Sequence, residues 1–354
     1  MRNSLVLYKN TLIFSLAFIL MACSKEEDAY EDINRPINFE KPSNFPDLAY
    51  TFPNNPLTEK GFELGRKLFF DGRLSRTGIV SCNFCHEQPF AFTHHGHDLS
   101  HGVDDLIGIR NTPSVQNMAF QTEYFFDGAS NNLEMVSIVP IHNPVEMDET
   151  LPSIISKLQA DPAYRKLFAQ AFPDGLVNST NMLKALAQYM TLLISSNSKY
   201  DKHVRNEPGG NFTALELQGK EIFQQKCSVC HATDIFTDNS FRNTGLPPNP
   251  FINDLGREEV SGNPADRYKF KVPSLRNVEL TAPYMHDGRL GSLESVLNFY
   301  TNGVQDSPTL DSLLKQNGTL GIPLSNQEKT ALIAFLKTLT DYDFVTNPKF
   351  NHRN

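Results

Sequence analysis

The sequence predicts a mainly α-helical protein of two domains that repeat one plan, with long irregular loops in each domain. Three short motifs of the first half recur in the second half at a single offset of 160 residues. The motif pairs are Pro113–Asn117 with Pro273–Asn277, Asp127-Gly128 with Asp287-Gly288, and Leu133-Glu134 with Leu293-Glu294. Three matches in register indicate an internal repeat. A chain of 354 residues is also long enough for two domains with separate cores.

The chain begins with the features of an exported lipoprotein. The apolar run Leu12–Ala22 has eleven residues, too few to span a bilayer, and indicates a signal peptide over residues 1–22. The run ends in Leu-Met-Ala-Cys, which resembles a bacterial lipobox with Cys23 as the lipidated residue. Residues 23–56, acidic at first and then rich in Pro and Asn, predict a flexible tether. We therefore expect a lipid-anchored protein of the cell envelope, in the periplasm, or at the cell surface if Ser24–Asp28 is an export tag rather than a spacer.

Apolar periodicity and capping signals predict the helices of both halves. Gly65–Phe69, ahead of the first cysteine pair, is echoed by Gly219–Phe223, ahead of the second. Two capping boxes open predicted helices of the second half, Thr213 with Glu216 and Ser325 with Glu328. The helix that ends the first half has the apolar face Leu183, Leu186, Ala187, Met190, Leu193 and Ile194. The last helix has the apolar face Leu332, Ile333, Phe335, Leu336 and Leu339.

Long stretches rich in Pro, Gly, Asn and Asp, such as Gly245–Pro264, separate the predicted helices. Loops of this length are uncommon in a compact domain unless something else organises them. The turn-rich segment Asn206–Gly210 marks the expected boundary between a first domain, residues 57–205, and a second domain, residues 206–354.

Two Cys-x-x-Cys-His motifs indicate what organises these loops. In this pattern the two thiols add across the vinyl groups of haem, and the adjoining His becomes the proximal ligand of the iron. The residues are Cys82, Cys85 and His86 in the first half, and Cys227, Cys230 and His231 in the second. A zinc site or a pair of disulfides is the alternative, but a zinc ribbon would have its pairs closer together, and each pair here is followed at once by His. We therefore expect two c-type cytochrome domains, each with one covalently bound haem c.

Seven motifs between Leu57 and Thr340 together resemble the bacterial dihaem cytochrome c peroxidases and their relatives, the MauG-type dihaem oxidases. The motifs are Ser81–His86, Arg110–Ser114, Phe125–Gly128, Glu146-Met147, Cys227–His231, Lys271–Asn277 and Pro283–Gly288. The resemblance implies a peroxidatic haem in the first domain, and a second haem that receives electrons from a small redox protein, a cytochrome c or a cupredoxin. In the implied reaction, H2O2 takes up two electrons and two protons and is reduced to two molecules of water.

The resemblance also implies roles for residues around the first haem. His86 would be the proximal ligand of the catalytic haem. Glu146 would be the distal carboxylate that moves a proton between the peroxide oxygens, a role that suits a buried carboxyl with a raised pKa; an ordinary surface carboxylate is the alternative. Four histidines, His94, His95, His97 and His101, lie between His86 and Arg110. His101, in a His-Gly pair, is the best match to the residue that caps the catalytic haem at rest, and His97 is next.

The second haem departs from the peroxidase pattern. The chain has no Met after Met285, so the Met that ligates this haem in the peroxidases is missing. Tyr300 stands at that position, and the MauG-type oxidases use Tyr there. Alternatively, Tyr300 is only a core residue and Met285 is the ligand. A phenolate is a hard, anionic ligand and should lower the reduction potential relative to Met. The chain also contains no Trp, and Phe126 occupies the position of the Trp that lies between the haems in both branches.

A calcium ion lies between the domains in this family, and its protein ligands have matches here. Asn111 would supply a side-chain oxygen, and Thr281 and Pro283 backbone carbonyls, with waters completing the shell. Hard oxygen ligands of this kind suit Ca2+. Alternatively, Asn111 is only a turn residue ahead of Thr112-Pro113.

Three functions therefore compete. The leading one is a lipid-anchored dihaem cytochrome c peroxidase. The second is a MauG-type oxidase that modifies a protein or a small substrate, which Tyr300 favours and the missing Trp opposes. The third is a dihaem electron carrier, which Glu146 opposes, because a carrier needs no distal acid. The net charge of −8 argues against a nucleic-acid partner. A homodimer is an expectation taken from the family alone.

Overall fold

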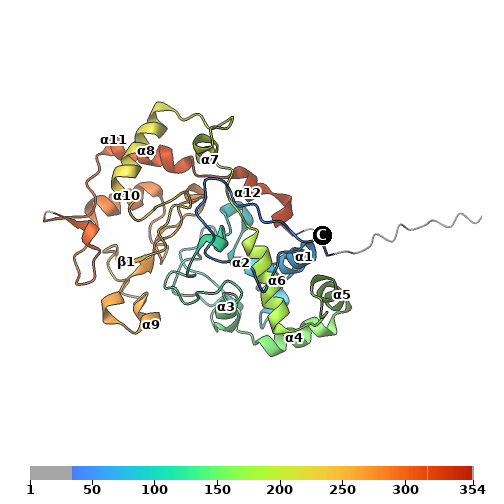
Figure 1. The fold of residues 1–354 in the computed structure, drawn as a ribbon. Coiled ribbons are helices and arrows are strands. Elements are labelled where there is room, and N and C mark those ends of the chain that lie inside the picture. The colour runs from blue at the N-terminus through green and yellow to red at the C-terminus, as the bar shows by residue number, and fades with distance from the viewer. Residues whose placement is uncertain (1–33, 317, 353–354) are drawn as a thin grey trace, which may run out of the picture. The chain divides into compact units, whose positions relative to one another are not determined.

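The computed structural model describes residues 34–316 and 318–352 (Figure 1). The predicted signal peptide and Cys23 lie outside the described residues. The α-helices are α1 Glu59–Phe69, α2 Cys82–Cys85, α3 Ile138–His142, α4 Leu151–Ala160, α5 Pro162–Ala171, α6 Ser179–Thr191, α7 Lys199–Val204, α8 Ala214–Lys226, α9 Glu258–Ser261, α10 Leu293–Asn302, α11 Asn326–Lys337 and α12 Tyr342–Thr346. Short 3-10 helices span Gly72–Leu74, Gln88–Phe90, Val103–Asp105, Met118–Phe120, Pro264–Asp266, Val278–Leu280, Ser312–Leu314 and Pro348–Phe350.

Strands are few and short. β1, Phe241–Arg242, pairs antiparallel with β2, Phe270–Lys271, and β3, Lys315–Gln316, pairs antiparallel with β4, Thr319–Leu320. In the first pair Phe241 lies opposite Lys271. The fold is therefore mainly helical, as the sequence predicts. In the described part of the chain, none of the helices combines the length and apolar character that a membrane span requires.

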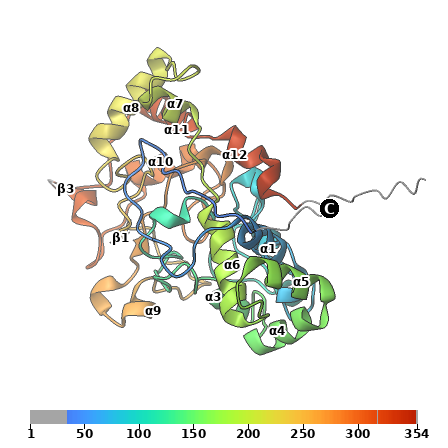
Figure 2. The same ribbon diagram turned by 45° about the vertical axis from the view of Figure 1, so that its right-hand side comes forward.

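Each half contains one close pair of helices, α1 with α6 and α8 with α11. Both pairs depend on a glycine at the crossing. A Cβ added to Gly65 would lie 1.9 Å from the carbonyl oxygen of Ala185, and a Cβ added to Gly219 would lie 1.9 Å from that of Ala331. Any larger residue would push the two helices apart. The helices α4 and α5 lie beside α6 and α1 respectively (Figure 2).

The predicted helix starts agree with the structure. Thr213 and Glu216 form a reciprocal capping box at the start of α8, and Ser325 and Glu328 form one at the start of α11. Each box satisfies two backbone N–H groups that would otherwise have no acceptor.

Corresponding contacts recur in the two halves. The Tyr124 N–H donates to the carbonyl of Ser130 at 2.7 Å, and the Tyr284 N–H donates to that of Leu290 at 2.8 Å. Their hydroxyls donate to the carbonyls of Met118 and Val278, at 3.2 and 2.8 Å. Tyr124 and Tyr284 are 160 residues apart, which is also the offset of the sequence motifs.

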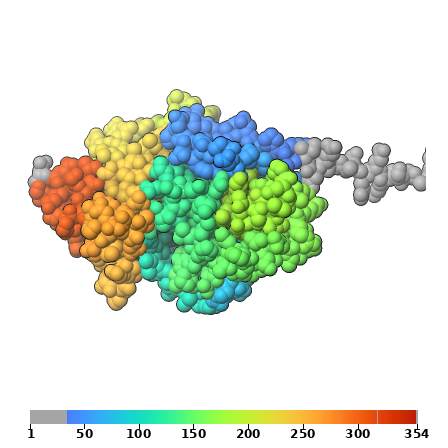
Figure 3. Space-filling view, turned by 60° about the horizontal axis from the view of Figure 1, so that its bottom comes forward, coloured from blue at the N-terminus to red at the C-terminus, as the bar shows by residue number. Residues whose placement is uncertain are grey.

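Residues 34–56 are packed, in contrast to the flexible tether that their composition predicts. Phe45 is buried with Phe120 of the first half and Ile235 of the second, and Asn44 donates to Asp201 at 3.0 Å. Figure 3 shows this N-terminal part, in blue, bordering both the green and the yellow parts of the chain. The apolar side chains among the Pro and Asn residues account for the difference, because they bury surface against the halves.

The C-terminal segment also crosses between the halves. Phe344 and Phe350 belong to the hydrophobic core of the first half, although the sequence placed them in the second domain. The Gln88 amide donates to the carbonyls of Phe344 and Asn347, at 3.1 and 2.8 Å. The helix α12 packs against the short 3-10 helix Gln88–Phe90 of the first half.

Candidate active site

The first Cys-x-x-Cys-His motif forms α2 and the residue that ends it. The thiols of Cys82 and Cys85 are partly buried and form no disulfide. His86 Nδ1 lies 2.8 Å from the carbonyl oxygen of Phe92, so the ring donates there and leaves Nε2 free for a metal. Burial lowers the pKa of His86 to about 4, so that the imidazole is neutral at pH 7.

The second motif follows α8 and repeats this geometry. Cys227 ends the helix, and Cys227 and Cys230 are again unpaired and partly buried. His231 Nδ1 lies 3.1 Å from the carbonyl oxygen of Phe236, and burial lowers the pKa of His231. Two unpaired thiols beside a neutral, oriented imidazole fit a covalently bound haem at each motif.

Glu146 lies beside the first motif. Its carboxylate accepts a hydrogen bond of 2.8 Å from the Asn143 side chain. Burial raises the pKa of Glu146 above its ordinary value, although the Asn143 hydrogen bond and the charge of Arg110 oppose this. Burial raises the pKa of the Cys85 thiol to about 12, and the negative charge of Glu146 is the second cause of this rise. The Glu146 carboxylate therefore lies near this haem-attachment residue.

His101 is brought to the same place. Its carbonyl accepts from the Cys85 thiol at 3.2 Å, and the next residues pack on Glu146, because the Val103 N–H donates to the Glu146 carbonyl at 2.7 Å. His101 Nδ1 lies 3.1 Å from an Asp105 carboxylate oxygen, which leaves Nε2 free to ligate. The structure therefore brings together Glu146, His101 and the first haem-attachment motif.

Three imidazoles pack against one another in residues 94–101, which we call the histidine segment. The rings of His94 and His97 stack with centroids 4.0 Å apart, and His97 meets His101 edge-on at 4.3 Å. His94 is only 6% exposed, its Nδ1 has no hydrogen-bond partner, and burial, together with His97 and His101, lowers its pKa to about 4. His94 is thus a third ligand candidate, whose burial the sequence did not indicate. Among the described residues, no group of three or more His, Cys, Asp or Glu side chains is arranged to hold a metal ion.

Tyr300, on α10, lies near the second motif. Burial raises its pKa, and the charges of Cys230 and Cys227 add to the effect. Within the described ranges its hydroxyl has no hydrogen-bond partner, whereas the hydroxyls of Tyr50, Tyr124, Tyr164, Tyr189, Tyr200 and Tyr284 each donate. Met285 packs against the same apolar cluster as Tyr300, which includes Phe299 and Val304. Tyr300 and Met285, the two candidates for the sixth ligand of the second haem, therefore pack against the same cluster.

Asn111 lies where the two halves meet. It is 8% exposed, and its N–H donates to the carbonyl of His286 at 2.7 Å. Its side-chain amide donates to the carbonyls of His97 and Asp98, at 3.0 and 3.1 Å, and no donor contacts Oδ1 in the described part. Asn111 thus lies beside the turn that follows Thr281 and Pro283, with an oxygen available for a hard cation.

Arg110 and Asp254 form a contact between the halves that the sequence did not indicate. The guanidinium donates to both carboxylate oxygens of Asp254 at 2.7 Å and also binds Asp127. Asp254 belongs to a loop without a counterpart in the first half: His231 to Pro273 is 42 residues, whereas His86 to Pro113 is 27. A repeat comparison could therefore not find this partner.

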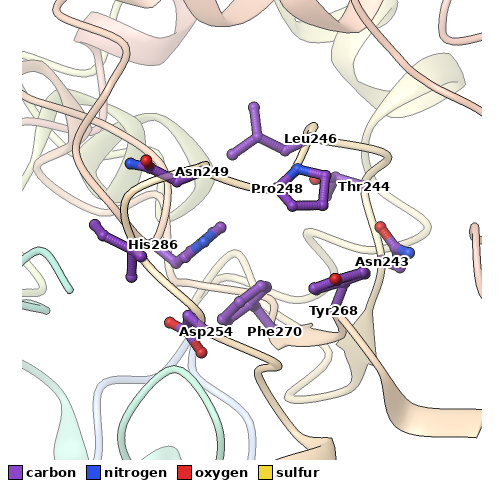
Figure 4. A pocket seen from close by; sticks show the side chains of 10 residues that line it. Asn243, Thr244, Leu246, Pro248, Asn249, Asp254, Tyr268, Phe270 and His286 are labelled. Atoms are coloured by element: carbon purple, nitrogen blue, oxygen red, sulfur yellow. The ribbon is translucent and has the colours of Figure 1, made fainter. Parts of the chain in front are cut away.

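The same loop encloses a small cavity (Figure 4). His286 stacks on Phe270 there, with ring centroids 3.7 Å apart, and Asp254 lies below them. Its volume of about 10 Å³ holds one water at most and no substrate. Phe126 lies nearby, because its carbonyl accepts from the N–H of Lys271 on β2 at 2.7 Å.

The chain is similar to several known proteins. The family profile described as "Di-haem cytochrome c peroxidase" matches residues 59–209. The methylamine utilization protein MauG of Methylorubrum extorquens is 34% identical over 340 residues, 91% of each chain. Cytochrome c551 peroxidase of Nitrosomonas europaea is 31% identical, over 94% of this chain and 92% of that one. The crystal structure of a MauG-like protein associated with microbial copper homeostasis has a TM-score of 0.79 and 32% identity, and covers 89% of this chain and 99% of its own.

Proposed function

Because the chain belongs to the family of dihaem cytochrome c peroxidases and MauG proteins, we propose that it is a dihaem cytochrome c peroxidase with Glu146 as its distal acid–base. Electrons would come from a small redox protein, a cytochrome c or a cupredoxin. The first domain, residues 57–205, would hold the peroxidatic haem, and the second, residues 206–354, the electron-accepting one. The contacts that recur 160 residues apart support this division into two haem domains.

The observation that carries the proposal is the meeting of Glu146 and His101 at the first haem motif. Cys85 contacts the His101 carbonyl at 3.2 Å, and Gly102 and Val103 pack on the backbone of Glu146. An electron carrier has no use for a carboxyl with a raised pKa at this position, whereas a peroxidase needs one.

The chemistry requires a proton to move between the two oxygens of H2O2. When bound, the haem would supply the iron that takes up peroxide and the electrons that reduce it. Glu146, once ionised, would accept a proton from one peroxide oxygen and return it to the other, which leaves as water. With two electrons and two protons in total, both oxygens end as water. Asn143 holds the carboxylate through its 2.8 Å hydrogen bond.

His101 would cap the first haem at rest and leave when the site is activated, with His97 and His94 as neighbouring alternatives. Asp105, at 3.1 Å from His101 Nδ1, orients the ring. Asp105 is exposed, so this contact lies at the surface.

A second candidate function, a MauG-type oxidase, is favoured by Tyr300. Tyr300 lies near Cys227 and Cys230, as a ligand of the second haem would, and no described residue forms a hydrogen bond with its hydroxyl. Phe126 opposes this function, because a phenyl ring is much harder to oxidise than the indole that it replaces.

Calcium, the lipid anchor and the dimer belong to the proposal as well. Asn111 Oδ1, with the carbonyls of Thr281 and Pro283, would hold Ca2+ between the halves. Cys23 would carry the lipid that anchors the protein in the cell envelope, facing the periplasm or the cell surface. The protein would form a homodimer, which is carried over from the family alone.

Stopped-flow spectroscopy of the purified dihaem protein tests the proposal. H2O2 is mixed with the fully oxidised protein and with protein reduced by one electron. A peroxidase with a capped first haem should react much faster after reduction, whereas equal rates in both states would contradict the capping role of the histidine segment.

A further inference from the structure

Two neighbouring residues of the first half hold the histidine segment, residues 94–101. The Asn111 side chain donates to the carbonyls of His97 and Asp98, at 3.0 and 3.1 Å. The carbonyl of Arg110 accepts from the N–H of Ser100 at 2.9 Å. The segment is therefore fastened on both sides of its midpoint by residues 110–111.

Arg110 and Asn111 are in turn held by the second half. The Asn111 N–H donates to the carbonyl of His286 at 2.7 Å, and both carboxylate oxygens of Asp254 accept from the Arg110 guanidinium at 2.7 Å. The Asp254 side chain is 3% exposed, so this ion pair is protected from water and from screening by salt. Figure 4 shows Asp254 and His286 near each other at the cavity.

Gly288 touches the histidine segment directly. A Cβ at this position would lie 2.2 Å from the carbonyl oxygen of Asp98 and 2.6 Å from its Cα, which are backbone atoms that cannot turn away. Gly288 also has a φ of +67°, which favours glycine. Three residues earlier in the same turn, Met285 packs against the apolar cluster that holds Tyr300.

We propose that the turn Pro283–Gly288 of the second half positions the histidine segment of the first half, with Gly288 as a positioning residue. The contacts run without a gap from the Tyr300 cluster through Met285 and His286 to Asn111, and from there to His97 and Asp98. The inference rests on the proposed function only in taking the segment to be a haem ligand. The test measures the backbone of the histidine segment directly.

The test compares Gly288→Ala with Gly262→Ala in the full dihaem protein. Gly262 is a matched control, since its φ is +66° and a Cβ there would meet no atom within 4 Å. Amide hydrogen exchange is followed at Ser100, Gly102 and Gly108, whose N–H groups donate to Arg110, Leu106 and Ser100. We expect Gly288→Ala to speed this exchange by roughly tenfold or more, as an overpacking substitution would, and to leave the amides of α6 unchanged. Equal exchange in the two variants would overturn the proposal.

The ferric spectrum of the first haem separates this inference from the proposed function. A spectral change that accompanies the faster exchange supports both. Faster exchange with an unchanged spectrum still supports the positioning role, and it rejects the histidine segment as a haem ligand. If Gly288→Ala does not accumulate, Asp254→Asn weakens the hold on Arg110 at nearly constant shape. It should speed exchange at Ser100, and unchanged exchange in that variant would overturn the inference.

Discussion

Replacing Glu146 by Gln should abolish most of the peroxidase turnover while the fold is retained. The Gln side chain keeps the oxygen that accepts the 2.8 Å hydrogen bond from Asn143, and its shape is nearly unchanged. It cannot take up or return a proton. The loss expected for a missing general acid–base is roughly 10²–10⁴-fold, or about 2.7–5.4 kcal/mol of barrier at 1.36 kcal/mol for each tenfold change in rate.

The raised pKa of Glu146 adds a second signature to this prediction. The carboxylate must be ionised to accept the first proton, so turnover should rise with pH through a pKa above the ordinary value of a glutamate. This acid limb should vanish in Glu146→Gln. A carboxyl whose folded-state pKa is raised makes the folded state less stable as pH rises through the unfolded and then the folded pKa. At pH 7 the Gln variant should therefore be at least as stable as the parent.

Steady-state H2O2 reduction, haem spectra and thermal unfolding of both proteins measure these effects. The control is Glu221→Gln, which neutralises an exposed glutamate on α8 and should leave rate, pH profile and stability unchanged. Near-normal turnover of Glu146→Gln, with an intact acid limb, would refute the reasoning and make the carboxylate structural.

Three further predictions concern the haems and the buried ion pair. A pyridine haemochrome assay should find two covalent haems per chain and only one in Cys227→Ala/Cys230→Ala; an unchanged count would reject the second attachment site. Tyr300→Phe should alter the ferric spectrum of the second haem and Tyr300→Met should raise its potential in a redox titration; no change in either would leave Met285 as the ligand. Arg276→Met should destabilise the protein by ~3–5 kcal/mol in urea, because Arg276 and Asp201 are both fully buried and bound at 2.7 and 2.9 Å. The Arg276 hydrogen bonds outweigh burial and hold the pKa of Asp201 below its usual range, so this stabilisation is present at pH 7 and lost in acid; equal stability of the variant and the parent would contradict it.

The parts of the fold that depend on local patterns could be predicted from the sequence. Capping boxes such as Thr213 with Glu216 act within one turn, and they appear in the structure as predicted. The grouping of Glu146 with the first Cys-x-x-Cys-His motif followed from the family resemblance, since no local pattern joins residues 85 and 146. The repeat was also visible in the sequence, whereas the corresponding contacts of Tyr124 and Tyr284 at the same offset were found only in the structure.

Contacts between distant segments could not be predicted in this way. Composition indicated a flexible tether over residues 23–56, yet within its described part Phe45 is buried under the cation of Arg276, 4.3 Å from its ring. Periodicity gives no partner for a single aromatic residue in a Pro-rich segment. The orphaned Nδ1 of His94 and the Arg110–Asp254 pair depend on the paths of two loops in space. Such sites become visible only when burial and distances are known.

Electron counting during peroxide turnover tests the central claim most directly. Reduced cytochrome c is offered to the dihaem protein with a limited amount of H2O2, and donor oxidation is recorded against peroxide consumed. The account predicts two donor electrons per H2O2 in the parent protein and a rate that collapses in Glu146→Gln. Peroxide consumption without donor oxidation, accompanied by oxidation of another protein, would contradict it and favour the MauG-type oxidase.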